Sequence, residues 1–241
     1  MEGMQRSGRG LFKIKELRDT EQGTEARGMS RSLATTWAEF RRMGRLVGRH
    51  LRYGRASFQP VSSPAKTEAL RTLFVVTNDL LRRSGVPYAL AYGTLLGWLR
   101  NGRLLAHDLD VDFGAPVEAF AAVWAARRFL PDGFTMHDTS AKHFGPKLYV
   151  SFRGWEADIY FYADDGREMH SLERSRNPGD VAPFPRDYFY PLQQAQMEGQ
   201  PTQVPARPEA LLTHVYQYLG EDGVRDPRTR YFVPRRRPSG R

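Results

Sequence analysis

Apolar residues recur at helical or strand spacing through most of residues 63–232, and this pattern predicts one folded domain. A Ser-Pro pair at 63–64 is typical of a helix start, and a Ser-Gly pair at 84–85 is typical of its end. An Arg-Gly pair at 153–154 separates two strand-like runs and predicts a hairpin turn. The pattern predicts helices at 64–83, 95–100, 116–128 and 208–219, strands at 87–92, 108–113, 147–152 and 155–162, and a small hairpin at 194–204.

These helices and short strands do not alternate in the steady rhythm of a parallel βαβ fold. The order of elements therefore predicts an α+β fold, in which helices pack on one face of a mixed sheet. The segment 164–187 is rich in Asp, Gly, Arg and Pro, and this composition predicts a loop.

Polar and basic segments flank the predicted domain. Residues 1–33 are rich in Gly, Arg, Glu and Ser and predict a disordered tail, and residues 233–241 predict a basic tail. Residues 34–62 are interpreted as a basic amphipathic helix and a linker, because apolar residues recur at helical spacing over 35–53. This helix either packs on the domain or docks on a membrane surface or an acceptor.

The charge balance limits the classes of binding partner that this chain favours. It has 36 Lys and Arg against 27 Asp and Glu, a net charge of +9, which suits nucleic acid, anionic lipid or phosphate-bearing substrates without distinguishing among them. For the basic helix, nucleic acid is the least favoured of these partners. The absence of cysteine excludes disulfides, cysteine-ligated zinc, iron–sulfur clusters and a cysteine nucleophile. No apolar run approaches the roughly 20 residues of a spanning helix, and the first residues lack a secretory apolar region. We expect a cytoplasmic protein, with residues 35–53 as an optional peripheral contact to anionic membrane.

Three aspartates alternate with apolar residues in the segment AHDLDVDFG. In a strand, Asp108, Asp110 and Asp112 would share one face, and Leu109 and its apolar neighbours would share the other, buried face. Successive aspartates would lie about 7 Å apart along such a strand. Like charges at this spacing are satisfied by a divalent cation with oxygen ligands. The alternatives are a solvated edge strand and a calcium loop, although the central Gly and terminal Glu of an EF-hand are missing.

Two further features favour a phosphoryl-transfer site. Upstream, Gly93-Thr94 opens a helix after a short strand, and such a turn presents backbone N–H groups and a hydroxyl to a phosphate, although ordinary turns have the same residues. Downstream, Asp158 lies in the strand-like run EADIYFY, among apolar and aromatic neighbours where a carboxylate is costly unless it is paired or bound to metal. Asp158 is therefore a candidate third carboxylate of a two-metal site.

The stretch GTLLGWLRNGRLLAHDLDVDFG resembles the signature of the LicD-type and fukutin-related transferases, in which G-[ST]-L-L-G-x-x-R precedes a D-x-D-[IV]-D strand. The run ADIYFY resembles the strand with the family's third aspartate, and YPLQQAQMEGQPTQVPARPEALLTHVY resembles the closing segment. His107 stands where the family usually has Trp, and YQYLGEDGVRDP departs from its ending, which bears on the substrate more than on metal binding. The matching residues are Gly93, Thr94, Leu95, Leu96, Gly97, Arg100, Asp108, Asp110, Val111, Asp112 and Asp158.

The resemblance implies a nucleotidyltransferase-type fold and the transfer of a phospho-alcohol, such as phosphocholine or an alditol phosphate. The group would move from a CDP-linked donor to a glycan or glycolipid acceptor, with Mg²⁺ or Mn²⁺ as cofactor and nucleoside monophosphate as product. Asp110, Asp112 and Asp158 would bind the metal, Asp158 alternatively accepting the proton of the attacking hydroxyl, and Asp108 would orient a metal-bound water. Phosphate-binding residues are then expected at Gly93, Thr94, Arg100 and Lys147.

Other interpretations stay open. A nucleotidyltransferase that releases pyrophosphate would share every metal ligand, and a non-catalytic scaffold of a glycan-assembly system would not need three facing charges. Lys142 and His143 are weaker candidates for a phosphate contact than Lys147, and both His107 and Arg100 have structural roles as alternatives. Three aromatic residues either stack on a base or sugar or belong to the core: Tyr149, Tyr160 and Tyr162.

Overall fold

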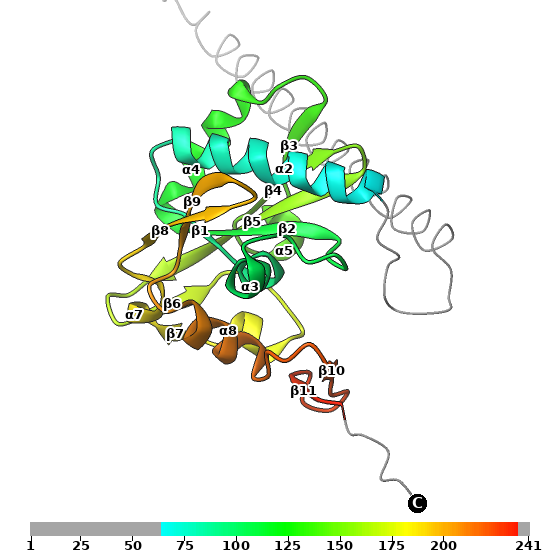
Figure 1. Ribbon diagram of the computed structural model, residues 1–241. Helices are drawn as coiled ribbons and strands as arrows, with labels where there is room; N and C mark the ends of the chain where they lie inside the picture. Colours follow the sequence, from blue (N-terminus) through cyan, green and yellow to red (C-terminus); the bar gives the residue numbers. More distant parts are fainter. Residues whose placement is uncertain (1–63, 236–241) are drawn as a thin grey trace, which may run out of the picture. The chain divides into compact units, whose positions relative to one another are not determined.

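The computed structural model describes residues 64–235 (Figure 1). The predicted tail at 1–33, the predicted basic helix at 35–53 and the end of the chain at 236–241 lie outside the described residues. The described part is built around a sheet of seven strands. They are β1 (Ala89–Leu90), β2 (Asp110–Pro116), β3 (Phe134–Asp138), β4 (Lys147–Phe152), β5 (Trp155–Asp164), β6 (Glu168–Ser171) and β7 (Phe184–Pro185).

The sheet is mixed, as the sequence predicts. Its strand order is β1-β2-β5-β4-β3, with β6 beside β5 and β7 beside β6. Strands β2 and β5 are parallel, and the other neighbours in this sheet are antiparallel. The predicted turn at 153–154 is confirmed, because it joins β4 to β5 as a hairpin. The parallel pair brings together two strands that are more than forty residues apart in the chain.

Helix α2 (Pro64–Arg83) covers the apolar face of the sheet (Figure 1). The ring of Phe74 stacks on that of Phe113 in β2, with the ring centroids 6.0 Å apart. Helix α4 (Phe120–Ala126) packs beside α2. No helix of the described part is long and apolar enough to cross a membrane. The α2 residues buried by this packing are Lys66, Ala69, Leu70, Leu73, Phe74, Thr77, Asn78, Leu80 and Leu81.

The opposite, polar face of the sheet is also covered by helices. The Tyr92 ring in α3 (Tyr92–Asn101) contacts the Tyr160 ring of β5, with centroids 4.7 Å apart. Helix α8 (Pro208–Tyr216) packs in turn on α3. The expectation of helices on one face is therefore wrong, because burying the aromatic residues of the polar face requires a second helical layer.

The segment 164–187 is not the continuous loop that its composition predicted. It contains short elements that extend the sheet beyond β5, each too short to show a hydrophobic period in the sequence. Their stability comes from pairing with β5 and from packing on α8 rather than from local propensity. They are β6, β7, α6 (Pro178–Val181) and α7 (Arg186–Phe189).

The first residues of helix α3 and of strand β2 differ from the prediction. Helix α3 begins at Tyr92, three residues early, because the backbone N–H of Leu95 already donates to the oxygen of Ala91. Strand β2 begins at Asp110, two residues late, so Leu109 precedes the strand and is 39% exposed. The expectation that Leu109 lies on the buried face is therefore wrong.

The C-terminal part has two small hairpins. The first, β8 (Gln193–Met197) with β9 (Gln200–Val204), confirms the hairpin predicted at 194–204. Helix α8 ends before its predicted limit, because Gln217 adopts a positive φ of 68°. The second hairpin, β10 (Gly223–Arg225) with β11 (Phe232–Pro234), carried no sequence signal, and neither did β3 or the short helix α5 (Ser140–His143).

Gly97 lies in the middle of α3 and allows the helix to approach the turn that follows it. A Cβ atom at this position would collide with the backbone oxygen of Arg103 and lie 3.2 Å from the backbone nitrogen of Leu105. This turn leads directly to Asp108 and Asp110. The glycine therefore fixes where the carboxylate segment starts.

We expect Gly97→Ala to lower the free energy of unfolding by about 1–3 kcal/mol, because the added methyl group forces the turn away from α3. Urea unfolding followed by circular dichroism measures the change. Leu99→Ala, at an exposed position of the same helix, is the control and should change stability by about 0.5 kcal/mol or less. Equal stability of Gly97→Ala and the wild type would contradict the close approach.

Candidate metal centre

The parallel register of β2 and β5 brings three carboxylates together on the polar face. In the register of the two strands, Asp112 pairs with Asp158. Asp110, two residues earlier on β2, pairs with Glu156. Oxygen atoms of Asp110, Asp112 and Asp158, which we call the carboxylate triad, all lie within 4.8 Å of one another. An all-oxygen donor set of this size suits a hard divalent cation. The structure therefore brings together the three residues that the sequence proposed as metal ligands.

The surroundings of the triad make its negative charge costly without a cation. Asp112 is 7% exposed and Asp158 is 3% exposed. Burial, followed by the neighbouring carboxylates with Asp110 first, raises the pKa of Asp112 well above its ordinary value. The buried Oδ1 atom of Asp158 accepts no hydrogen bond. A buried oxygen without a donor, among like charges, is the arrangement that a bound cation satisfies.

Asp108 does not belong to the triad. It lies in the turn before β2, so its predicted place on the strand is wrong. Its Oδ2 atom is buried and accepts no hydrogen bond, and the Nζ atom of Lys66 donates to the backbone oxygen of Asp108 at 3.1 Å. Burial and then the charge of Asp110 raise the pKa of Asp108 to about 7. A role for Asp108 in orienting a ligand stays a prediction.

The Gly-Thr turn joins α3 to the metal-site strand. The Oγ1 atom of Thr94 accepts a hydrogen bond of 2.9 Å from the backbone N–H of Asp112, and the Thr94 side chain is fully buried. A Cβ atom at Gly93 would lie 3.0 Å from the Oδ1 atom of Asp108, so the glycine leaves room for this carboxylate. The first N–H groups of a helix have no partner inside the helix. The start of α3 thus faces the carboxylates, and its contact with phosphate stays a prediction.

Lys147 is buried between two carboxylates. Its Nζ atom lies 3.2 Å from Asp158 Oδ2 and 2.9 Å from Glu173 Oε1. Burial lowers the pKa of Lys147, but the attraction of the two carboxylates outweighs it and leaves the pKa raised. The Tyr160 hydroxyl donates to the same Asp158 Oδ2 atom at 3.2 Å. The sequence did not single out Glu173, because no periodic pattern marks its loop.

The other basic candidates lie around this centre. Arg100 donates a hydrogen bond of 2.7 Å to the backbone oxygen of Leu219, which ties α3 to the segment that follows α8 and is a structural role. The Nδ1 atom of His143 lies 3.6 Å from Glu173 Oε1. Burial, and then the charges of Arg100 and Lys66, lower the pKa of His107. Lys142 is exposed at the end of α5.

Two of the three candidate aromatic residues are buried, whereas Tyr160 is half-buried and contacts Asp158 directly. Tyr149 is 1% exposed and its ring stacks on that of His137. Tyr162 is 6% exposed and its ring contacts that of Phe184. Tyr216 of α8 was missed by the sequence analysis: burial, followed by the charges of Asp112, Asp180 and Asp108, raises its pKa well above the ordinary value. Tyr216 is the last residue of α8.

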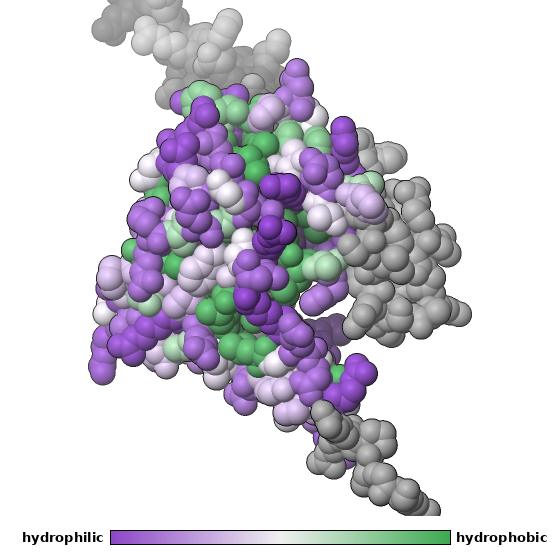
Figure 2. Space-filling model, viewed as in Figure 1, coloured by the Kyte–Doolittle hydropathy of each residue, from purple (hydrophilic) through white to green (hydrophobic). Residues whose placement is uncertain are grey.

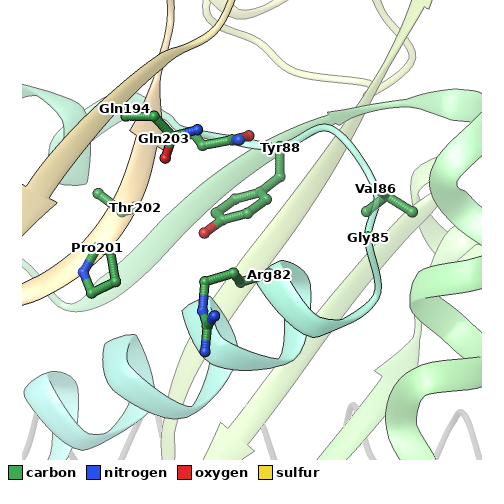
Figure 3. Close-up of a pocket in the computed structure, with 8 residues that line it drawn as sticks. All are labelled: Arg82, Gly85, Val86, Tyr88, Gln194, Pro201, Thr202 and Gln203. Carbon is green, nitrogen blue, oxygen red and sulfur yellow. The ribbon is translucent and has the colours of Figure 1, made fainter.

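A cavity of about 160 Å³ lies elsewhere on the domain (Figure 3). In the view of Figure 3, the Tyr88 hydroxyl points between the β8–β9 hairpin and Arg82 of α2. None of the triad residues lines this cavity, so it is separate from the candidate metal centre. Its lining residues are Arg82, Gly85, Val86, Tyr88, Gln194, Pro201, Thr202 and Gln203.

Residues 85–207, just over half of the chain, match the family described as LicD/FKTN/FKRP, nucleotidyltransferase domain. The matched region contains the Gly-Thr turn, the triad and the β8–β9 hairpin. A comparison with curated proteins gives no match. The mixed sheet of this chain agrees with the family's description as a nucleotidyltransferase domain. The fold is that of the nucleotidyltransferases.

The solved structures to which this chain is similar include two transferases and an antibiotic-resistance factor. The lincomycin-bound lincosamide antibiotic adenylyltransferase LnuA is 15% identical, with a TM-score of 0.40 over 63% of this chain and 88% of that chain. The antibiotic-resistance factor ANT(2'')-Ia is 14% identical, with a TM-score of 0.37 over 58% of this chain and 69% of that chain. The GTP-bound terminal uridylyl transferase 4 from Trypanosoma brucei is 15% identical, with a TM-score of 0.30 over 51% and 35%.

The like charges of the carboxylate triad predict whether removing one of them raises or lowers the free energy of unfolding of the metal-free protein. A carboxyl group whose pKa is raised in the folded state contributes stability below its unfolded pKa and loses that stability as the pH rises through the folded pKa. In the presence of EDTA at pH 8, we expect Asp112→Asn to raise the free energy of unfolding by about 1 kcal/mol or more, which is about 2–4 °C in Tm. Millimolar Mg²⁺ should stabilise the wild type but not this variant.

Asp165→Asn is the control with the opposite expected sign. Hydrogen bonds, led by the backbone N–H of Glu168, hold the pKa of exposed Asp165 below its ordinary value, so loss of its charge should lower stability. Thermal unfolding monitored by fluorescence from pH 5 to pH 8 measures both variants. A lower Tm of Asp112→Asn in EDTA would show that the triad is not electrostatically strained.

Proposed function

The chain belongs to the LicD/FKTN/FKRP family of nucleotidyltransferase-fold transferases, and we propose that it transfers a phospho-alcohol from a CDP-linked donor to a glycan acceptor. The observation that carries this proposal is the convergence of Asp110, Asp112 and Asp158 within 4.8 Å, in the region that matches the family. The transferred group would be of the phosphocholine or alditol phosphate type. The products would be the modified glycan and CMP.

The triad would hold a Mg²⁺ or Mn²⁺ ion, which would supply charge neutralisation for the donor diphosphate. Asp110 and Asp112 would be its ligands from β2. The Oδ1 atom of Asp158, which accepts no hydrogen bond, is free to serve as the third ligand or to take the proton of the attacking hydroxyl. The acceptor oxygen would attack the phosphorus that carries the alcohol, and the bond from that phosphorus to CMP would break.

The residues around Asp158 would keep this carboxylate oriented. Lys147 and Tyr160 both donate to its Oδ2 atom, which leaves Oδ1 pointing to the opposite side of the carboxylate. Glu173 in turn holds Lys147 at 2.9 Å. Lys147 would therefore act mainly by positioning Asp158 rather than by binding the leaving phosphate. Preorganised charge of this kind needs no rearrangement during the reaction.

The start of α3 would contribute to phosphate binding, because backbone N–H groups at a helix start attract anions. Gly93 leaves room there for the carboxylate of Asp108, which a bound phosphate would have to accommodate. Thr94 already uses its oxygen as an acceptor for the Asp112 N–H, so its hydroxyl hydrogen is the group that could donate to a phosphate. In this proposal the same turn places both the metal ligand and the phosphate.

The charge of the chain supports a proposal for where the reaction takes place. We propose that the basic segment 35–53 makes a peripheral contact with anionic membrane on the cytoplasmic side, where a lipid-linked glycan would be modified. The net charge of +9 supports this contact. The segment carries five arginines, Arg41, Arg42, Arg45, Arg49 and Arg52.

We expect Asp110→Asn and Asp112→Asn each to lower metal-dependent release of CMP from a CDP-linked alcohol by about 1,000-fold or more, because the metal loses a charged ligand. The assay follows CMP by chromatography with a panel of CDP-linked alcohols and Mg²⁺. Asp187→Asn is the matched control. This aspartate is exposed and forms a surface ion pair with Arg207, so activity should stay within about twofold.

The same assay separates the proposal from its alternatives. Release of pyrophosphate from CTP, with no CMP from any CDP-linked donor, would identify a nucleotidyltransferase instead. Absence of metal-dependent nucleotide binding in calorimetry would favour a scaffold. Full activity of either aspartate variant would refute the mechanism whichever product is formed.

A further inference from the structure

Two arginine side chains meet at one neutral oxygen atom near the end of the domain. The Nη1 atom of Arg225, in β10, donates to Asn177 Oδ1 at 2.9 Å. The Nε and Nη2 atoms of Arg230 lie 3.4 Å and 3.3 Å from the same oxygen. Two guanidinium groups that share an amide oxygen bring two positive charges close together. We call Arg225 and Arg230 the arginine pair.

No carboxylate balances these two charges in the described part of the chain. Its ion pairs, from Arg71–Glu198 to Arg207–Asp187, include neither arginine. The acid nearest in sequence, Asp226, accepts hydrogen bonds from the backbone N–H groups of its own turn. Arg225 instead makes its second bond to a neutral group, the backbone oxygen of Arg230, at 2.7 Å. Such a pair favours an anion that can accept from both guanidinium groups.

Several contacts hold the arginine pair in place. Asn177 is oriented from its other side, because its Nδ2 atom donates to Asp180 Oδ2 at 2.8 Å. The guanidinium of Arg225 lies 4.7 Å from the ring centre of Phe232. Arg230 adopts the left-handed backbone conformation, with φ of 65°, which costs free energy for a residue with a side chain. The surface near β10 and β11 is mainly hydrophilic in Figure 2.

The arginine pair lies next to the end of α8. The Phe232 ring contacts the Tyr216 ring of that helix, with centroids 5.5 Å apart. Figure 1 shows β10 and β11 just beyond the end of α8. None of the described residues that contact the arginine pair belongs to the triad, so the pair is a second cluster of charge beside the candidate metal centre.

We propose that Arg225 and Arg230 bind a phosphate group carried by the acceptor, at a subsite distinct from that of the donor diphosphate. The assignment to the acceptor rests on the proposed function, whereas the anion site itself does not. The acceptor class is then a phosphate-bearing glycan or glycolipid. Its phosphate is held by two charge-assisted hydrogen-bond donors, while a hydroxyl of the same molecule reaches the triad.

The test measures anion binding by the full chain without metal or nucleotide. Glycerol 3-phosphate and inorganic phosphate are titrated in EDTA by calorimetry at low ionic strength. We expect Arg225→Gln and Arg230→Gln each to weaken binding by about 10-fold or more. Arg228→Gln is the matched control, because it removes the same charge from the same turn outside the pair, and it should change affinity by less than about twofold. Equal losses in all three variants would overturn the proposal.

Asn177→Asp tests the absence of a carboxylate directly. The substitution keeps the shape of the side chain and places a negative charge between the two guanidinium groups. We expect phosphate binding to be lost. Thermal unfolding checks that the variant is folded, because the new carboxylate also faces Asp180, to which the Asn177 amide donates a hydrogen bond. Unchanged phosphate affinity in the folded variant would overturn the proposal.

Two further binding experiments identify which molecule carries the phosphate that the arginine pair binds. Binding of CDP with Mg²⁺ should be unchanged in the Arg225→Gln and Arg230→Gln variants and lost in Asp112→Asn, whereas phosphate binding should survive in Asp112→Asn. Loss of CDP affinity in the arginine variants would assign the pair to the donor and overturn the acceptor subsite. Binding to phosphatidylglycerol vesicles that falls in these variants, but not in Arg228→Gln, supports a lipid-linked acceptor phosphate. Phosphate binding without any CDP binding would refute the proposed function and leave the anion site standing.

Discussion

The parallel pairing of β2 with β5 is the constraint on which the candidate site depends. It places Asp112 directly beside Asp158, and it places Phe113 beside Ile159 on the opposite face. A shift of one residue would exchange the two faces, burying carboxylates under α2 and exposing the core. The stacking of Phe74 on Phe113 therefore stabilises the register and, through it, the metal site. The stability of the fold and the geometry of the site rest on one interaction.

The polar face is arranged so that buried charge is only partly neutralised by the protein. Lys147 offsets Asp158 and Glu173, and Tyr160 donates to Asp158 as well. Asp112 forms no ion pair with a cation in the described part of the chain, and burial and the neighbouring carboxylates raise its pKa despite the charge of Lys147. A protein that fully neutralised the triad would have no affinity left for a metal ion. The triad carries an excess of negative charge, whereas the arginine pair carries positive charge without a carboxylate partner among the described residues.

Local sequence was sufficient for the elements that have a clear period or a specific motif. The alternation of Asp with apolar residues predicted β2 and the face of Asp110 and Asp112. A carboxylate among apolar and aromatic residues identified Asp158 as a neighbour of these two. The Gly-Thr turn was located as a helix start, although α3 begins three residues before the predicted Leu95. These features are encoded within a few residues of one another, where sequence reasoning is strongest.

The tertiary structure decided the features that join distant segments. Asp108 lies outside strand β2 because Lys66, more than forty residues earlier in the chain, binds the turn that contains Asp108. Glu173 reaches Lys147 from a segment without a motif. Arg225, Arg230 and Asn177 meet across about fifty residues of sequence. The sequence by itself determined which residues could hold a metal ion, because strand periodicity is a local property. Only the folded chain decided which residues surround it, because charge compensation depends on which side chains packing brings within a few ångströms.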